Sequence, residues 1–319
     1  MRNAYVAALR ELARKNPNVL ALVSDNGAIV YDDFRRDCPD QFFNVGIAEA
    51  NLISVAAGLA SCGKIPFVYT ISAFLTIRAA EQVRNDVCMQ KMNVKLAGIG
   101  AGFVYSDLGP THHATEDLAW MRALPGMTVI APADAAEARQ ATFAAAEHDG
   151  PVYLRLATGG TPVVYPETPA FAIGRANTLR TGRHAAIIAC GRILHDVLAA
   201  ADILAAEGVS CRVIDMHTLA PLDNAIVLAA ARDTGAIITV EEHSVIGGLG
   251  SAVAEVLADN DCPARLRRLG LERVFARGYG DYEYMKRRNG LAIDDIAAAV
   301  RDLLEQDDAQ PTQRGYALT

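Results

Sequence analysis

Short apolar runs alternate with segments of helical spacing along most of the chain, and this alternation limits the possible folds more than any other feature. Buried strands are expected at residues 19–23, 43–45, 66–71, 94–98, 127–131, 152–156, 185–189, 210–215 and 236–241. Helices are expected at residues 48–61, 76–89, 115–124, 135–148, 194–207 and 225–232, and after Gly250 to about residue 257. Because parallel strands need long crossover connections, usually helices, the pattern predicts an α/β fold with mostly parallel sheets covered by helices.

A composition shift interrupts the pattern near the middle of the chain. Residues 157–172 contain three prolines and no helical spacing, which is typical of a segment that joins two domains. The 319 residues of the chain suffice for two domains of roughly 150 residues each. The expected organisation is a first domain over residues 1–158, a linker over 159–180, a second domain over 181–305 and a loose tail over 306–319.

The net charge of −7 and the hydrophobic content of 51% narrow the class of protein. A chain this apolar is not intrinsically disordered. An acidic chain lacks the basic face expected of a nucleic-acid binder or of a protein held on a membrane surface. No apolar run reaches the ~18 residues of a membrane span, and the six cysteines include no closely spaced pair. The expectation is a cytoplasmic enzyme with reduced thiols.

Glu49 is the first candidate functional residue. It lies near the start of an expected helix, in the sequence Asn44-Val-Gly-Ile-Ala-Glu-Ala-Asn-Leu52, where almost all its neighbours are apolar. A carboxylate in such surroundings loses its hydration unless it is paired or protonated. Two interpretations stay open: Glu49 caps the N-terminus of the helix, or it is poised to share a proton in a functional site.

Two adjacent histidines form the second candidate. His112 and His113 follow Gly109-Pro-Thr111 in a loop between an expected strand and an expected helix. Loops beyond the carboxyl ends of parallel strands are where ligands usually bind. Because adjacent side chains do not easily face the same pocket, at most one of the two histidines is expected to be functional.

Several stretches of the sequence form a recognisable series. They are Phe42-Phe-Asn-Val-Gly-Ile-Ala-Glu49, Pro66-Phe-Val-Tyr-Thr-Ile-Ser-Ala-Phe74 with Glu81-Gln-Val-Arg-Asn85, Leu108-Gly-Pro-Thr-His-His-Ala-Thr-Glu-Asp-Leu118, Met121-Arg-Ala-Leu-Pro-Gly-Met-Thr-Val-Ile-Ala-Pro-Ala-Asp134 and Val240-Glu-Glu-His-Ser-Val-Ile-Gly-Gly-Leu-Gly250. In their order and spacing they resemble the C-terminal half of the transketolase family of thiamine-diphosphate enzymes. The resemblance runs from about residue 1 to residue 304 and implies a pyrimidine-binding domain followed by a transketolase C-terminal domain.

The resemblance gives roles to the candidate residues. It implies that Glu49 hydrogen-bonds N1′ of the cofactor's aminopyrimidine, which allows that ring to remove the C2 proton of the thiazolium. It places Phe74 as the aromatic residue that stacks on the aminopyrimidine. Ile71 and Ile77 stand where many relatives have further aromatic residues. His112 matches a histidine that contacts the oxygen atoms of the substrate beside the reacting carbon.

Asp107, Leu108 and Thr158 are the further positions at which the resemblance implies substrate contacts. Typical transketolases have an aspartate at the position of Leu108, which recognises a sugar hydroxyl, and an arginine near Thr158, which binds the substrate phosphate. Leucine accepts no hydrogen bond and threonine carries no charge, so an ordinary pentose-phosphate substrate is in doubt. Arg155 is close in sequence, but its odd separation from Thr158 predicts that it faces the other side of the strand.

The family binds the cofactor's diphosphate through Mg²⁺, with a Gly-Asp-Gly motif and a later asparagine in a separate N-terminal domain. The sequence contains no Gly-Asp-Gly, and the expected pyrimidine-binding domain begins near residue 1. We therefore expect no metal ligands in this chain and a partner, the N-terminal transketolase subunit, that supplies the diphosphate and Mg²⁺ site. The simplest assembly is α2β2.

The function implied by the resemblance is that of a subunit of a split transketolase, which transfers a two-carbon ketol unit from a ketose donor to an aldehyde acceptor such as an aldose. One alternative is a decarboxylating enzyme, similar to the β subunit of 2-oxo-acid dehydrogenases or to deoxyxylulose-phosphate synthase. Another alternative is a non-catalytic remnant of the fold, against which the presence of Glu49, Phe74 and His112 argues. Release of carbon dioxide from a 2-oxo acid distinguishes the first alternative.

Overall fold

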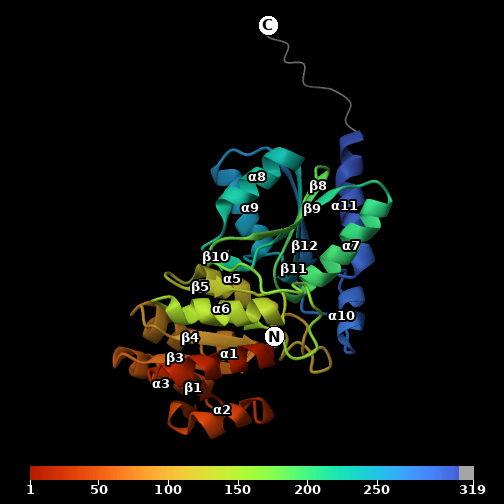
Figure 1. Cartoon of the computed structure of the whole chain (residues 1–319). Helices are drawn as coiled ribbons and strands as arrows, with labels where there is room; N and C mark the ends of the chain where they lie inside the picture. The colour runs from red at the N-terminus through yellow and green to blue at the C-terminus, as the bar shows by residue number, and fades with distance from the viewer. Residues whose placement is uncertain (309–319) are drawn as a thin grey trace.

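The computed structural model describes residues 1–308, which form two mostly parallel sheets flanked by helices (Figure 1). The seven-stranded sheet has the order β10-β5-β6-β4-β3-β1-β2 and consists of β1 (Val19–Val23), β2 (Phe42–Asn44), β3 (Ile65–Ile71), β4 (Lys95–Ile99), β5 (Thr128–Ile130), β6 (Val152–Leu156) and β10 (Thr218–Ala220). The five-stranded sheet has the order β12-β11-β8-β9-β7 and consists of β7 (Asn177–Arg180), β8 (Ala185–Ala189), β9 (Cys211–Asp215), β11 (Ala236–Ser244) and β12 (Arg265–Leu271). Among the strands of residues 1–308, only β10 with β5 and β7 with β9 pair antiparallel, so the expected fold class is confirmed.

Helices cover the two sheets. They are α1 (Arg2–Lys15), α2 (Asp32–Asp37), α3 (Glu49–Ser61), α4 (Ala80–Gln82), α5 (Asp117–Ala123), α6 (Ala135–Glu147), α7 (Leu194–Ala206), α8 (Asn224–Thr234), α9 (Leu249–Asp259), α10 (Tyr282–Arg288) and α11 (Ile293–Asp308), with short turns at η1 (Ile29–Tyr31), η2 (Pro39–Gln41) and η5 (Gly191–Ile193). Within residues 1–308, none of these helices combines the length and the apolar character needed to cross a membrane. The expected tail over residues 306–319 lies mostly outside the described residues, and α11 continues to Asp308.

The segment after β3 differs from the regular helix expected over residues 76–89. It consists of two π-helical segments, η3 (Phe74–Arg78) and η4 (Val83–Cys88), on either side of the short helix α4. The hydroxyl of Thr76 donates a hydrogen bond to the carbonyl of Ser72 at 2.8 Å, a local bond of the kind that competes with a regular helix. Wide π turns are common at functional sites, and this one carries Phe74.

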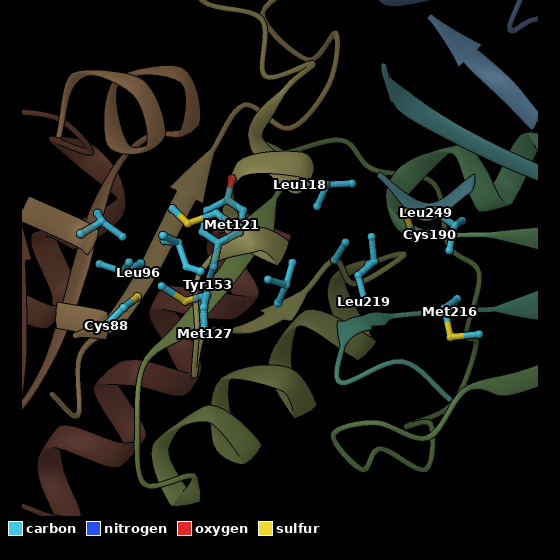
Figure 2. Packing of buried hydrophobic residues seen from close by; sticks show 14 of the residues in the cluster. Cys88, Leu96, Leu118, Met121, Met127, Tyr153, Cys190, Met216, Leu219 and Leu249 are labelled. Carbon is cyan, nitrogen blue, oxygen red and sulfur yellow. The ribbon is translucent and has the colours of Figure 1, made fainter. Parts of the chain in front are cut away.

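One strand of the seven-stranded sheet comes from the second half of the chain. β10 pairs with β5, with Thr218 opposite Ile130. Leu219, the middle residue of β10, is 2% exposed. Buried side chains from both sheets form one continuous cluster around it, and Figure 2 shows Leu219 between Met127 and Met216. The two sheets therefore share part of their hydrophobic core.

The region expected to be a linker over residues 159–180 contains a strand. β7 pairs antiparallel with β9 at the edge of the five-stranded sheet, and its residues are only partly buried. An edge strand that faces solvent on one side needs no apolar run, which is why the composition gave no signal for it.

Candidate active site

Three segments that carry the candidate residues meet at the carboxyl ends of the strands of the seven-stranded sheet. Glu49 is the first residue of α3, Phe74 follows β3, and His112 lies in the long loop after β4. β3 and β4 are neighbouring parallel strands, so the loops that follow them leave the sheet side by side. Ligands of open α/β sheets bind at this edge.

Glu49 is buried, with 3% of its surface exposed. Its Oε2 accepts a hydrogen bond from Nη1 of Arg78 at 2.8 Å. The residue that precedes the helix, Ala48, provides no side-chain cap. The carboxylate is thus in an ion pair with another element, while its place in the first turn of α3 also suits an acid at a helix N-terminus, so both interpretations of Glu49 stay open.

Arg78 links Glu49 to Phe74. Its guanidinium carbon lies 4.1 Å from the centre of the Phe74 ring, within the range of a cation–π contact. Half of its side chain, 50%, is exposed to solvent. The sequence reasoning missed this residue, although its separation of four residues from Phe74 places the two on one helical face.

His112 completes this group. Its ring lies 5.1 Å from the ring of Phe74, centre to centre, in an edge-to-face arrangement. Its Nδ1 is 3.0 Å from the hydroxyl of Thr111. His112 is partly exposed, so it is accessible to a ligand. We call Glu49, Phe74, Arg78 and His112 the Glu49 cluster.

The neighbouring histidine has a different environment. His113 is 3% exposed and packs edge-to-face on Phe103 at 5.8 Å. Burial lowers the pKa of its imidazole below the ordinary value, which favours the neutral ring. The two adjacent rings therefore face different surroundings, and only His112 lies in the Glu49 cluster.

The loop before His112 carries Asp107 and Leu108 on its surface. Asp107 is exposed, and 47% of Leu108 is exposed. The next residue, Gly109, has a φ of +78°, and a Cβ there would lie 2.3 Å from the ring of Tyr279. Only glycine fits this position, so the loop packs closely against a tyrosine from the second half of the chain.

Thr158 lies beside the N-terminus of the chain. Its carbonyl accepts a hydrogen bond from the amino group of Met1 at 3.4 Å and another from the hydroxyl of Thr161 at 3.3 Å. These contacts connect Thr158 to the chain terminus and to the segment after β6. Nothing described for residues 1–308 joins it to the Glu49 cluster.

Arg155 is enclosed by residues of both halves of the chain, and none of the hydrogen bonds described for it involves a member of the Glu49 cluster. It is 2% exposed, and its Nε donates to the carboxylate of Asp117 at 2.7 Å. Its Nη2 donates to the carbonyls of Ala114 at 2.7 Å and Glu242 at 3.0 Å. Because Glu242 belongs to β11, Arg155 connects the two sheets.

The two isoleucines of the candidate set differ in exposure. Ile71 ends β3 and is partly buried, whereas 62% of Ile77 in η3 is exposed. Ile47, two residues before Glu49, is 77% exposed. Single exposed apolar side chains are common on protein surfaces, so these exposures do not by themselves indicate a covered surface.

The largest described cavity lies elsewhere. It has a volume of about 690 Å³ and is lined by residues that include Cys88, Thr128, His148 and Pro151. Thr128 begins β5 and Pro151 precedes β6, so the cavity lies at the amino ends of the strands. It contains none of the candidate residues.

Comparisons with known families match both parts of the chain. The family described as "transketolase, pyrimidine binding domain" matches residues 1–162. The family described as "transketolase, C-terminal domain" matches residues 174–285. The order of the two domains is the one that the sequence motifs imply.

Related proteins of two kinds are similar to nearly the whole chain. A 6-deoxy-6-sulfo-D-fructose transketolase subunit of Clostridium sp. (strain MSTE9) is 40% identical over 307 residues, 96% of this chain and 95% of that protein. A 1-deoxy-D-xylulose-5-phosphate synthase of Syntrophotalea carbinolica is 38% identical over 306 residues, 95% of this chain but 48% of that protein. A solved structure described as a split gene transketolase, inactive β4 tetramer, matches with a TM-score of 0.89 at 44% identity and covers 95% of this chain and 98% of that one. The chain belongs to the transketolase family and consists of its pyrimidine-binding domain followed by its C-terminal domain.

Proposed function

We propose that this chain is the C-terminal subunit of a split, thiamine-diphosphate-dependent transketolase, which transfers a two-carbon ketol unit from a ketose donor to an aldehyde acceptor. The observation that carries the proposal is the convergence of Glu49, Phe74 and His112, from three separate segments, at one edge of the sheet. The similarity to a transketolase subunit over 95% of that protein's length also supports it.

The residues of the Glu49 cluster fit the aminopyrimidine half of the cofactor. The buried carboxylate of Glu49 provides an acceptor in a region of low dielectric, where a shared proton is held strongly. The flat ring of Phe74 already stacks on the planar guanidinium of Arg78, so it can stack on another planar group that carries N–H donors. Ile71 and Ile77 would add aliphatic contacts. When bound, thiamine diphosphate supplies the nucleophilic carbon that attacks the carbonyl of the donor.

Glu49 and His112 have distinct tasks in this proposal. Glu49 holds a proton at N1′ of the aminopyrimidine. His112 contacts the oxygen atoms of the substrate, and the hydroxyl of Thr111 beside Nδ1 orients its ring. Phe74 separates the two polar groups and keeps water away from the carboxylate.

The diphosphate and Mg²⁺ are assigned to a partner, the N-terminal transketolase subunit, in an α2β2 assembly. The sequence has no Gly-Asp-Gly, and the similar synthase is about twice as long as the region it shares with this chain. Ile47 and Ile77, which are close in sequence to Glu49 and Arg78, are exposed, and we propose that such a partner covers them.

The identity of the donor depends on the exposed loop at Asp107 and Leu108. Leu108 offers an apolar surface where a carboxylate is usual, and the contacts of Thr158 lie at the N-terminus. We propose that this site does not bind the sugar hydroxyl and the phosphate of the substrate in the way that typical transketolases do. A panel of ketoses that carry a phosphate, a sulfonate or neither group at the far carbon tests this part.

A decarboxylating reaction is the second candidate, because a deoxyxylulose-phosphate synthase is 38% identical to this chain. The reconstituted complex would then release carbon dioxide from pyruvate in the presence of an aldehyde. Ketol transfer without carbon dioxide release supports the transketolase proposal. If the complex binds the cofactor but catalyses neither reaction, the remaining interpretation is that the chain is a non-catalytic remnant of the fold.

The function is tested with the chain assembled with its diphosphate-binding subunit. We expect this complex to transfer a two-carbon unit from a ketose to an aldehyde when thiamine diphosphate and Mg²⁺ are present. Separation of the sugar products by chromatography measures the transfer. A complex that binds the cofactor and transfers no such unit from any ketose of the panel would contradict the proposal.

A further inference from the structure

Arg78 makes the two contacts that the proposed function requires of the cofactor's aminopyrimidine. Its Nη1 donates to Oε2 of Glu49 at 2.8 Å, and its guanidinium carbon lies 4.1 Å from the centre of the Phe74 ring. The guanidinium of Arg78 thus donates a hydrogen bond to Glu49 and covers the ring of Phe74 at the same time.

The chemistry of the two groups explains this coincidence. A guanidinium is planar, carries N–H donors at its edge and stacks on aromatic faces. An aminopyrimidine is also planar, offers a protonated ring nitrogen to a carboxylate and stacks in the same way. A site built for one planar donor therefore accepts the other, and the two groups exclude each other because both need the same face of Phe74.

The exposure of the two partners shows which of them can leave. The side chain of Glu49 is 4% exposed and that of Arg78 is 50% exposed. Glu49 is fixed in the first turn of α3, whereas the head of Arg78 reaches the site from η3 on a flexible stem. An arginine that is half in solvent regains its hydration when it swings out, so the ion pair holds it only weakly.

We propose that Arg78 occupies the place of the aminopyrimidine in the cofactor-free chain and must swing out before thiamine diphosphate binds. The proposal rests on the function proposed above. While the site is empty, Arg78 neutralises the buried carboxylate of Glu49. Without Arg78 this carboxylate would be an unpaired charge in an apolar region. The cofactor then replaces one partner of Glu49 with another, and the competition lowers its apparent affinity.

The test compares Arg78→Ala with the wild-type chain, each assembled with the diphosphate-binding subunit. Isothermal titration with thiamine diphosphate in the presence of Mg²⁺ measures the dissociation constant. We expect Arg78→Ala to bind the cofactor roughly two- to tenfold more tightly, because a half-exposed ion pair contributes little more than that. Equal or weaker binding by Arg78→Ala would overturn the proposal.

Two further experiments make the result specific. Arg84→Ala removes an exposed arginine of η4 that hydrogen-bonds Asn85, and its affinity for the cofactor should equal that of the wild type. In the isolated chain, thermal unfolding of Arg78→Ala, Glu49→Gln and the double variant forms a cycle. The two substitutions should be coupled there, and strictly additive shifts in Tm would contradict the ion pair.

The outcome separates the two proposals. If Arg78→Ala binds the cofactor no more tightly while the wild-type complex still transfers the ketol unit, only the role of Arg78 is wrong. If the wild-type complex binds thiamine diphosphate and transfers nothing, the proposed function is wrong, whatever Arg78 does.

Discussion

The Glu49 cluster and the buried contact around Arg155 both pair an arginine with a carboxylate, and they differ in what surrounds the pair. Arg155 and Asp117 are 2% and 1% exposed on their side chains, and the hydroxyl of Tyr153 also donates to Asp117 at 2.7 Å. In the Glu49 cluster the carboxylate is equally buried, but its arginine is 50% exposed. The first arginine is enclosed by both sheets, and the second lies at an open edge.

We propose that this difference distinguishes a structural ion pair, at Arg155, from a ligand site, at Glu49. A charge that the chain itself encloses and hydrogen-bonds holds two parts of the fold together, and its removal leaves an unpaired buried charge. A buried charge whose partner faces solvent can exchange that partner for a ligand. Burial of an acid alone is therefore a weak sign of function, and the mobility of its partner is the better one.

A third group of polar residues lies between the two sheets and belongs to the enclosed kind. Glu137 of α6 and Asp215 of β9 are fully buried, and burial raises the pKa of both carboxyl groups. Asp134 lies next to them, and the hydroxyl of Tyr165 donates to Asp215 at 2.7 Å. The negative charge of Asp215 adds to the effect of burial in raising the pKa of Glu137.

The largest effect is expected at the open site. Glu49→Gln removes the carboxylate that holds the proton, and the turnover of the assembled enzyme should fall by about 10²- to 10⁴-fold. The fold should persist, because glutamine fills the same volume. Steady-state kinetics with a circular dichroism spectrum of each variant checks both points.

The matched control for Glu49 is Glu81→Gln, an exposed acid of the short helix α4. Its turnover should equal that of the wild type. Turnover by Glu49→Gln at the wild-type rate would return Glu49 to the role of an acid near a helix end.

The enclosed pair is expected to affect stability instead. Arg155→Met leaves Asp117 buried without its cation, which should lower the free energy of unfolding by about 3–5 kcal/mol. Denaturant titration of the isolated chain measures this value. Arg180→Met breaks an exposed pair with Asp202 and should change it by less than about 1 kcal/mol. Equal effects of the two substitutions would show that enclosure does not matter.

A smaller effect on activity is expected at His112. His112→Ala should lower kcat/KM by about ten- to a hundredfold, since it removes a hydrogen bond to the substrate, while the affinity for the cofactor stays close to that of the wild type. His195→Ala, a histidine with 46% of its side chain exposed, serves as the control. A loss confined to cofactor binding would place His112 against the cofactor rather than the substrate.

The smallest effect concerns the pH dependence of stability. Burial raises the pKa of Glu137 well above its ordinary value and raises the pKa of Asp215 to about 7. The folded chain therefore binds more protons than the unfolded chain, and this contribution is complete below about pH 4 and is lost as the pH rises through 7.

Glu137→Gln tests that contribution, because an amide still accepts from the N–H of Ala133 and donates to Asp215 without a titrating proton. Between pH 5 and pH 9 the free energy of unfolding should fall in both proteins. The fall should be smaller in the variant than in the wild type, and the difference between the two falls should be about 1 kcal/mol. Glu147→Gln, an exposed acid of the same helix, should keep the wild-type slope. A wild-type slope in Glu137→Gln would mean that Glu137 does not contribute to the pH dependence.

The strands of the fold were predictable where burial leaves a continuous apolar run. β1, β6 and β8 have the bounds expected from the sequence, and each is buried along its whole length. β12 lies at a sheet edge, contains three arginines and is largely exposed or half-buried, so no apolar run marks it. β10 is three residues long, and its place in the other sheet depends on tertiary packing.

The candidate site was predictable only in part for the same reason. Glu49, Phe74 and His112 were identified through motifs, and the topology of β3 and β4 explains why they meet. The ion pair of Arg78 with Glu49 depends on the π-helical turn of η3, which no periodicity indicates. The raised pKa of Glu137 depends in part on Asp215, which is far away in the chain, so it could not be predicted before the packed structure was known.

The central claim is that the Glu49 cluster is half of an active site that a second subunit completes. The most direct test measures two-carbon transfer from a ketose to an aldehyde by the purified chain, by the diphosphate-binding subunit and by their mixture, each with thiamine diphosphate and Mg²⁺. Activity in the mixture alone is the predicted result. Full turnover by the purified chain without the second subunit would contradict the claim.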